Sequence, residues 1–373
     1  MAELEGAAIW QGLSQSRLSR RGLLSSLGVA AIGFTLQACG QGSGSKGDPA
    51  GDKINFYTWD TYIGATTLAD FETANGIKVQ TSYFATNDEL FAKLKAGNPG
   101  YDVIVPSNEF VTRMRLAKML EPLDMAKLPN IKNIAPEFME ADYDSPPPRH
   151  SVPYTWLVLG IGYRKSRVNG TPDSWKWLFD SDLYKGRIAL TSEAADLIRL
   201  GAKFMGKSLN GVDPATAKAV EDMLIRQKPN IKAFHEDNGQ DMLLAGDVDL
   251  VLETNGDIAQ IAVEDPDIAF VVPKEGSLLN ADTLCIPKGA PRPDQAHNFI
   301  NFLLDATVGK HIIETILYPT PNAAAKLLMP ESYRANPIIF PTGAGMDASE
   351  WGKFEGADKA RAFEEAITRV RAA

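Results

Sequence analysis

The stretch INFYTWDTYIG (residues 54–64) decides how this chain is interpreted. Its first half alternates apolar and polar side chains with a period of two, which predicts a β-strand. Its second half carries Trp59, Asp60 and Tyr62, so two large rings and a carboxylate follow directly on the predicted strand. The function of the protein should explain why two aromatic rings and a carboxylate lie together at the end of a strand.

Strands and helices alternate from this stretch onward. Buried parallel strands have continuous apolar runs, half-buried strands alternate, and helices commonly end at glycine. The predicted elements are, in chain order, a strand at 54–58, a helix through Leu68 and Phe71 that Gly76 ends, a strand at 77–84, a helix capped by Asn87 or Asp88 with Gly97 beyond its end, strands at 101–107 and 187–190, helices at 196–205 and 240–244, a strand at 249–252 and a helical stretch at 296–316. This order predicts an α/β fold of mostly parallel sheets flanked by helices.

The composition narrows the class of protein. With 373 residues, the chain is long enough for two lobes that each have their own core. A hydrophobic content of 44% and a charged content of 23% are typical of globular proteins. The formal charge of −9 argues against a nucleic-acid partner, which would require a basic face.

The first residues predict export. Arg20 and Arg21 precede a short apolar run, and Leu36-Gln37-Ala38-Cys39 follows it, as in a signal peptide over residues 1–38. Paired arginines are typical of the twin-arginine route, although they also occur in ordinary signals. The sequence before Cys39 resembles a bacterial lipobox, which implies that Cys39 is lipidated and anchors the protein to the membrane. The alternative is a plain signal peptide with an incidental cysteine.

Residues 39–52 are rich in glycine and serine, which predicts a flexible tether. After removal of the signal peptide, Cys285 is the one cysteine besides Cys39, and it lies in the apolar stretch DTLCIP. We expect Cys285 to be a buried small side chain without a disulfide.

Acidic and aromatic side chains follow the predicted strands. In open α/β sheets, ligands bind outside the carboxyl ends of the strands, so these side chains are expected to face one cleft. They comprise seven carboxylates, two tyrosines and a tryptophan, namely Trp59, Asp60, Tyr62, Glu109, Glu193, Asp196, Glu253, Asp257, Asp282 and Tyr318, with Ser107 beside them.

Seven carboxylates in one cleft need a compensating positive charge. No Lys or Arg occurs within these loop ends, so we expect a metal ion or a ligand to supply it. The stretch DVDLVLETNGD (247–257) approaches a calcium loop but lies partly in a predicted strand. The histidines are scattered, so no metal site and no cofactor is expected. An organic cation fits better, because carboxylates bind ammonium groups strongly and rings cover the methylenes between them.

These same stretches resemble the spermidine/putrescine-binding proteins of bacterial ABC importers. The resemblance extends over nearly all of residues 53–350 and is carried by FYTWDTYI, GIKVQTSYFATNDELFAKLKAG, YDVIVPS, KPNIKAFH, PKEGS, NFLLDATVGKHI and YPTPNAAAKLL. It implies a two-lobe periplasmic-binding-protein fold of type II, with one lobe at 53–154 plus 282–326 and the other at 155–281 plus 327–373. Ligand would bind between the lobes, which close by a hinge motion.

The resemblance also implies site residues. Trp59 and Tyr62 match an aromatic pair of that family, and Glu193 and Asp196 match an acidic pair that holds one amine. The other matches are Ser107 to a serine, Asp257 to an acid of putrescine binders, Asp282 to a central aspartate and Tyr318 to the tyrosine of YPTPN.

Four positions depart from the family pattern. Thr254 stands where a tryptophan is usual, and Asn280 stands where a Trp or Phe is usual. Glu109 replaces a serine or an aromatic residue, and Gly352 replaces a glutamine of spermidine binders. The implied site has therefore lost ring surface and gained a carboxylate, and we include Thr254, Asn280 and Glu109 among its residues. Spermidine, putrescine, a longer polyamine and an agmatine-like guanidine all stay open as ligands.

The resulting hypothesis is a monomeric, lipid-anchored periplasmic receptor that delivers a polyamine-like cation to the permease of an ABC importer. A receptor that presents its ligand to a sensor protein is an alternative that the sequence does not exclude. A secreted hydrolase with paired acids is a third. The chain shows no nucleophile elbow, HExxH or SxxK stretch, so we expect no enzyme.

Overall fold

Residues 53–373 are described by a computed structural model of the chain. The stretch that opens the sequence is strand β1 (Lys53–Thr58), as its alternation predicts. The strands are β1 (Lys53–Thr58), β2 (Lys78–Tyr83), β3 (Val103–Ile104), β4 (Ser151–Arg164), β5 (Ile188–Thr191), β6 (Ile231–His235), β7 (Leu250–Thr254), β8 (Ile268–Val271), β9 (Leu278–Cys285) and β10 (Glu350–Trp351).

Helices connect nearly all of these strands. They are α2 (Thr67–Asn75), α3 (Asn87–Lys95), α4 (Asn108–Leu116), α5 (Pro136–Met139), α6 (Lys176–Phe179), α7 (Ala194–Phe204), α8 (Pro214–Gln227), α9 (Gly239–Leu244), α10 (Asn255–Glu264), α11 (Pro293–Leu303), α12 (Ala306–Ile316), α13 (Ala323–Leu328), α14 (Glu331–Arg334), α15 (Ala344–Asp347) and α16 (Ala357–Ala372). The α/β class predicted from the sequence is confirmed.

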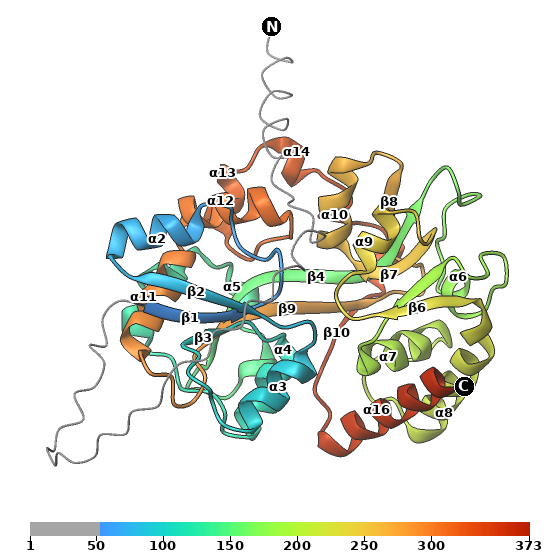
Figure 1. Ribbon diagram of the computed structural model, residues 1–373, viewed down its shortest axis with the longest axis horizontal. Coiled ribbons are helices and arrows are strands. Elements are labelled where there is room, and N and C mark those ends of the chain that lie inside the picture. The colour runs from blue at the N-terminus through green and yellow to red at the C-terminus, as the bar shows by residue number, and fades with distance from the viewer. Residues whose placement is uncertain (1–52) are drawn as a thin grey trace, which may run out of the picture. The chain divides into compact units, whose positions relative to one another are not determined.

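The strands form two parallel groups joined by two long antiparallel strands. The order along the sheet is β2-β1-β3-β9-β4-β7-β5-β6, with β10 beside β9 and β8 beside β4. Strands β1, β2 and β3 pair in parallel, and so do β5, β6 and β7. Strand β4 pairs with β9 over residues 151–158 and with β7 and β8 beyond that point, so it extends from one group into the other (Figure 1).

Each group of strands has its own apolar core. Phe56, Phe71 and Phe299 belong to a buried cluster beside β1 and β3. A second cluster includes Trp175 and Phe179, beside β5 and β7. Because two cores lie on either side of the connecting strands, the surface between them is free to form a cleft.

Element boundaries depart from the sequence predictions in three places. Helix α3 is capped by Thr86, whose hydroxyl accepts from the Glu89 amide, rather than by Asn87 or Asp88. The stretch 101–107 is not one continuous strand, because β3 covers Val103–Ile104 and Ser107 pairs separately with Asp282 of β9. The helical stretch 296–316 is two helices, α11 and α12, separated at Asp305, which caps α12.

Other local predictions are confirmed. Gly76 ends α2 with a φ of 68°, a left-handed conformation that glycine adopts without strain. Cys285 is a buried free cysteine among the described residues. The predicted signal peptide, Cys39 and the tether at 39–52 lie outside the described residues. Within residues 53–373, no helix combines the length and the apolar character that a membrane span requires.

Candidate ligand-binding site

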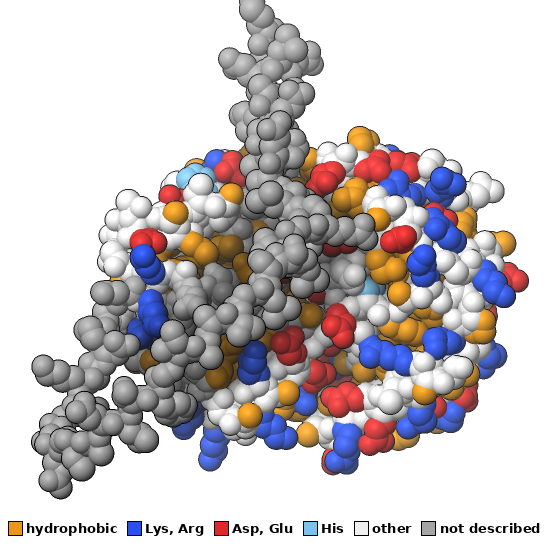
Figure 2. Space-filling model, in the orientation of Figure 1, with side chains coloured by type: hydrophobic (Ala, Val, Ile, Leu, Met, Phe, Trp, Pro, Cys, Tyr) orange, Lys and Arg blue, Asp and Glu red, His pale blue; other side chains and the backbone are white. Residues whose placement is uncertain are grey.

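A cavity of about 110 Å³ lies where the carboxyl ends of β1, β3, β5 and β7 meet strand β9. Acidic side chains gather near the middle of the molecular face drawn in Figure 2. All twelve residues predicted as ligand-binding line this one cavity: Trp59, Asp60, Tyr62, Ser107, Glu109, Glu193, Asp196, Thr254, Asp257, Asn280, Asp282 and Tyr318. The structure therefore brings them together, and their contact with a ligand stays a prediction.

Asp282 lines the site from within β9 rather than from a strand end. Its backbone pairs with Thr155 of β4, and the Tyr62 hydroxyl donates a hydrogen bond of 2.6 Å to its carboxylate. The same Tyr62 hydroxyl also contacts the hydroxyl of Thr155. Burial raises the pKa of Asp282 to about 7, the Tyr62 bond opposes that rise, and Asp257 adds to it. This carboxyl therefore changes charge near neutral pH.

Thr254, Asp257 and Tyr318 form a second hydrogen-bonded group at the start of α10. The Thr254 hydroxyl donates to the Asp257 carboxylate at 2.8 Å, and the Tyr318 hydroxyl lies 2.8 Å from the same oxygen of Thr254. Burial raises the pKa of Asp257 to about 6, although its bonds with Thr254 and Tyr318 oppose the rise. A carboxylate with two hydroxyl neighbours is fixed in place and ready to accept from a ligand donor.

The aromatic side chains that line the cavity come from segments that are distant in sequence. The indole of Trp59 is held by a 3.0 Å hydrogen bond to the Val105 carbonyl and packs against Phe84 with ring centroids 4.4 Å apart. The rings of Tyr62 and Tyr318 meet edge to face, 4.8 Å apart. Their positions are therefore fixed by contacts that do not involve a ligand.

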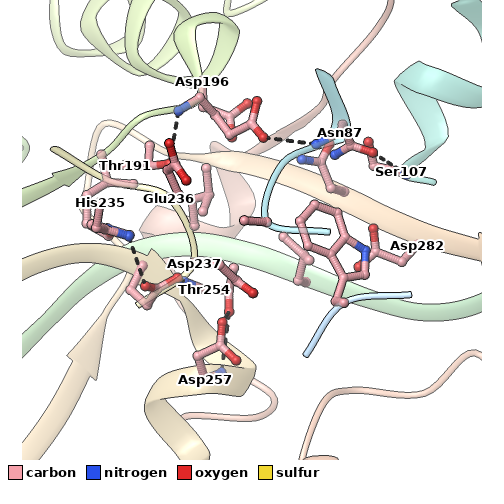
Figure 3. Close-up of a pocket in the computed structure, with 18 of the residues that line it drawn as sticks. Asn87, Ser107, Thr191, Asp196, His235, Glu236, Asp237, Thr254, Asp257 and Asp282 are labelled. Carbon is pink, nitrogen blue, oxygen red and sulfur yellow. Dashed lines mark hydrogen bonds and ion pairs between the residues drawn. The ribbon is translucent and has the colours of Figure 1, made fainter. Parts of the chain in front are cut away.

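Glu193 and Asp196 mark the other end of the cavity, at the N-terminus of α7. Glu193 is the N-cap residue, and its carboxylate accepts from the Asn87 amide at 3.3 Å. Burial raises the pKa of Glu193 to about 8, and Asp196 adds to the rise. Burial likewise raises the pKa of Asp196 to about 7. Figure 3 shows Asp196 across the cavity from Asp257, near Asn87 and Ser107.

Sequence reasoning missed several lining residues, of which Asp237 matters most. Asp237 follows β6 (Ile231–His235), a strand that was not predicted, and lines the cavity beside Asp257 (Figure 3). Burial raises the pKa of Asp237 to about 9, and the charges of Asp257 and Glu253 add to the rise. A strand prediction over IKAFH would have placed Asp237 at the same edge of the sheet as the other acids. Other lining residues that were missed are Asn87, Phe110, Thr191, His235 and Glu236.

His235 is structural rather than a source of positive charge. Its Nε2 lies 3.0 Å from the Leu252 carbonyl, and burial lowers its pKa to about 4. The imidazole is therefore neutral at physiological pH.

One expectation about charge is wrong. Metal or ligand was expected to supply all of the compensating charge, but the guanidinium of Arg199 contacts the Glu109 carboxylate directly. The sequence concealed this pair, because Arg199 lies within α7 and not at a strand end. Among the described residues that line the cavity, none is Lys or Arg, and nine are Asp or Glu. The remaining carboxylates therefore favour a cationic ligand.

Replacing Thr254 with valine is expected to lower the free energy of unfolding by about 1 kcal/mol. Valine keeps the shape of the side chain but cannot accept from the Asp257 amide at the start of α10. Urea unfolding at neutral pH measures the loss. The control is T307V, at an exposed position in the first turn of α12, which should change stability by less than about 0.5 kcal/mol. Equal effects of the two changes would contradict the capping role.

Comparisons with known proteins agree with this architecture. The sequence model of a family described as bacterial extracellular solute-binding protein matches residues 66–342. The spermidine/putrescine-binding periplasmic protein of Salmonella typhimurium is 33% identical over 323 residues, which cover 86% of this chain and 92% of that protein. The putrescine-binding periplasmic protein PotF of Escherichia coli is 32% identical over 308 residues, which cover 77% of this chain and 83% of PotF.

Solved structures show the same fold. The spermidine/putrescine ABC transporter substrate-binding protein PotD from Streptococcus pneumoniae, in complex with calcium and HEPES, matches with a TM-score of 0.73 at 31% identity and covers 86% of this chain and 99% of its own. The Tp0655 (TpPotD) lipoprotein of Treponema pallidum matches with a TM-score of 0.73 at 25% identity and covers 86% and 100%. The predicted two-lobe α/β fold of periplasmic binding proteins is thereby confirmed.

Proposed function

We propose that this chain, which belongs to the bacterial extracellular solute-binding proteins, captures a linear polyamine in its acidic cavity and delivers it to the permease of an ABC importer. The observation that carries the proposal is the lining of the cavity. Nine carboxylates and the rings of Trp59, Tyr62 and Tyr318 line it, and no Lys or Arg side chain does so among the described residues.

A polyamine matches this arrangement group by group. Each ammonium donates charge-assisted hydrogen bonds to carboxylates, with Asp257 and Asp282 at one end and Glu193 and Asp196 at the other. The rings of Trp59 and the tyrosines cover the methylenes and attract each ammonium by about 0.5–2 kcal/mol. The names of the similar proteins from Salmonella and Escherichia coli, quoted above, support the same ligand class.

Two lobes that close over the ligand account for its burial. We assign residues 53–154 plus 282–326 to one lobe and 155–281 plus 327–373 to the other. This division is supported by the two apolar cores, one around Phe56 and Phe299 and the other around Trp175. The strands β4 and β9, which pass between them, are the natural hinge.

The proposed receptor acts in the periplasm as a monomer. Export by the twin-arginine route and lipidation of Cys39 would anchor it to the membrane, with residues 39–52 as the tether. Its cycle is capture, closure and release to the permease. The proposed cycle contains no covalent step.

Isothermal titration against a panel of cations tests the proposal. At least one of putrescine, cadaverine, spermidine and agmatine is expected to bind with a dissociation constant of about 1 μM, which corresponds to a binding free energy of about −8 kcal/mol. Butylamine is the matched control, because it has the same methylene chain as putrescine but an ammonium at one end only. We expect it to bind at least about tenfold more weakly. Absence of binding by every di- and polycation would overturn the proposed function.

A further inference from the structure

The ion pair between Glu109 and Arg199 closes one end of the cavity. Glu109 lies in the first turn of α4 and lines both the cavity and a smaller adjoining pocket. Arg199 lies in α7 and lines the smaller pocket but not the cavity. The pair therefore forms the boundary between the two spaces, next to Glu193 and Asp196.

The guanidinium is held firmly in this position. Arg199 is 3% exposed, and besides Glu109 it donates a hydrogen bond to the Lys353 carbonyl. The Asn108 side chain fixes the same segment through a 3.0 Å bond to the Gly352 carbonyl. A Cβ atom at position 352 would overlap the Glu109 carboxylate, so the absence of a side chain there makes room for the pair.

The pair changes the charge at this end of the cavity. Glu109, Glu193 and Asp196 form one acidic group, and Asp237, Glu253, Asp257 and Asp282 form another beyond it. Arg199 supplies a positive charge to the first group and none to the second, since its carboxylate partner is Glu109. This buried cation occupies the place beside Glu109 that a ligand ammonium would otherwise take.

We propose that Arg199 acts as a built-in cation, so that the cavity accepts a linear diamine and disfavours a triamine. One ligand ammonium binds at Asp257 and Asp282, and the other binds at Glu193 and Asp196. A third ammonium at this end of the cavity would lie beside the guanidinium, where like charges repel and Glu109 is already paired. The inference rests on the proposed function, because it names which polyamine the same site selects.

The test compares the dissociation constants of putrescine and spermidine by isothermal titration. The parent protein is expected to bind putrescine at least about tenfold more tightly than spermidine. In R199A the ratio should move toward spermidine by at least about tenfold, because the guanidinium is gone and Glu109 is free to accept a third ammonium. R199M keeps the volume of the side chain, and in the event that R199A does not fold it should show a shift of several-fold in the same direction.

The matched control is K203A. Lys203 lies one turn further along α7 and forms an ion pair with Glu350, but it lines neither pocket. Its loss should leave the ratio unchanged. The inference is overturned when the parent prefers spermidine, or when neither Arg199 variant shifts the ratio beyond that of K203A. If the parent binds no polyamine at all, the proposed function fails instead, so the two failures are distinguishable.

Discussion

Replacement of Asp282 by asparagine is expected to weaken diamine binding at least about a hundredfold. Asp282 is 4% exposed, and its carboxylate is held by the Tyr62 hydroxyl at 2.6 Å, so a ligand ammonium would meet it in a dry, fixed position. Removing one partner of a buried charge pair costs about 2–5 kcal/mol of binding free energy. A hundredfold rise in the dissociation constant corresponds to about 2.7 kcal/mol, which lies within this range. Isothermal titration with putrescine measures the loss.

The same replacement should not destabilise the ligand-free protein. Burial raises the pKa of Asp282 to about 7, so the folded state favours the neutral form of this side chain, and asparagine is neutral at every pH. The midpoint of thermal unfolding above neutral pH is therefore expected to stay the same or to rise. Loss of binding together with a large loss of stability would indicate a structural role for Asp282 instead.

Asp60 provides a graded control for this prediction. It also lines the cavity, but its side chain is exposed to solvent at the mouth. Exposed ion pairs contribute about 1 kcal/mol or less, so D60N should weaken binding by less than about tenfold. Equal losses in D60N and D282N would contradict the buried contact that we propose between Asp282 and the ligand ammonium.

Binding of a diamine is expected to strengthen by about a hundredfold or more between about pH 5.5 and about pH 8.5. Burial raises the pKa values of several cavity carboxyls above their ordinary range, to about 6 for Asp257, about 7 for Asp196 and Asp282, about 8 for Glu193 and about 9 for Asp237. The ligand-free cavity therefore retains protons at neutral pH. An ammonium pairs with the ionised form, so binding must displace those protons, and the cost falls as the pH rises.

The same pKa shifts predict how the stability of the ligand-free protein changes with pH. A carboxyl whose pKa is raised on folding stabilises the folded state most at low pH, and this contribution is lost as the pH rises through the raised pKa. Thermal unfolding of the ligand-free protein should therefore shift to lower temperature between about pH 5 and about pH 8. The stabilisation produced by saturating putrescine should grow over the same range.

Proton release distinguishes this explanation from a general effect of pH. Titrations at pH 7 in phosphate and in Tris, which differ in heat of ionisation, should give different apparent enthalpies, corresponding to release of protons on binding. D237N removes the carboxyl with the highest of these pKa values, so it should release fewer protons than the parent. Affinity that is independent of pH, with no difference between buffers, would show that the carboxyls are ionised before the ligand arrives.

The local sequence predicted most elements that deliver the site. The alternation in INFYT predicted β1, and the carboxyl-end rule placed Trp59, Asp60 and Tyr62 beside the cleft. Glycine at position 76 predicted the end of α2 because its left-handed conformation is a local property of the backbone. Such signals depend on neighbours within one or two turns of chain, which is why they can be read without a structure.

Pairings between distant segments could not be read in that way. Asp237 was missed because β6 was not recognised. Its raised pKa arises first from burial and then from the charges of Asp257 and Glu253, none of which its neighbours in sequence reveal. Arg199 was missed because it is an ordinary helical residue until α7 packs against α4 and brings it onto Glu109.

The sequence by itself determined the kinds of side chain that gather at the strand ends, and therefore the preference for a cation. Only the tertiary structure decided which carboxylates already have an internal partner and which are left for a ligand. The physical reason is that charge compensation and desolvation depend on distances through space. Residues 109 and 199 are far apart along the chain, yet their side chains are in contact and compensate each other's charge.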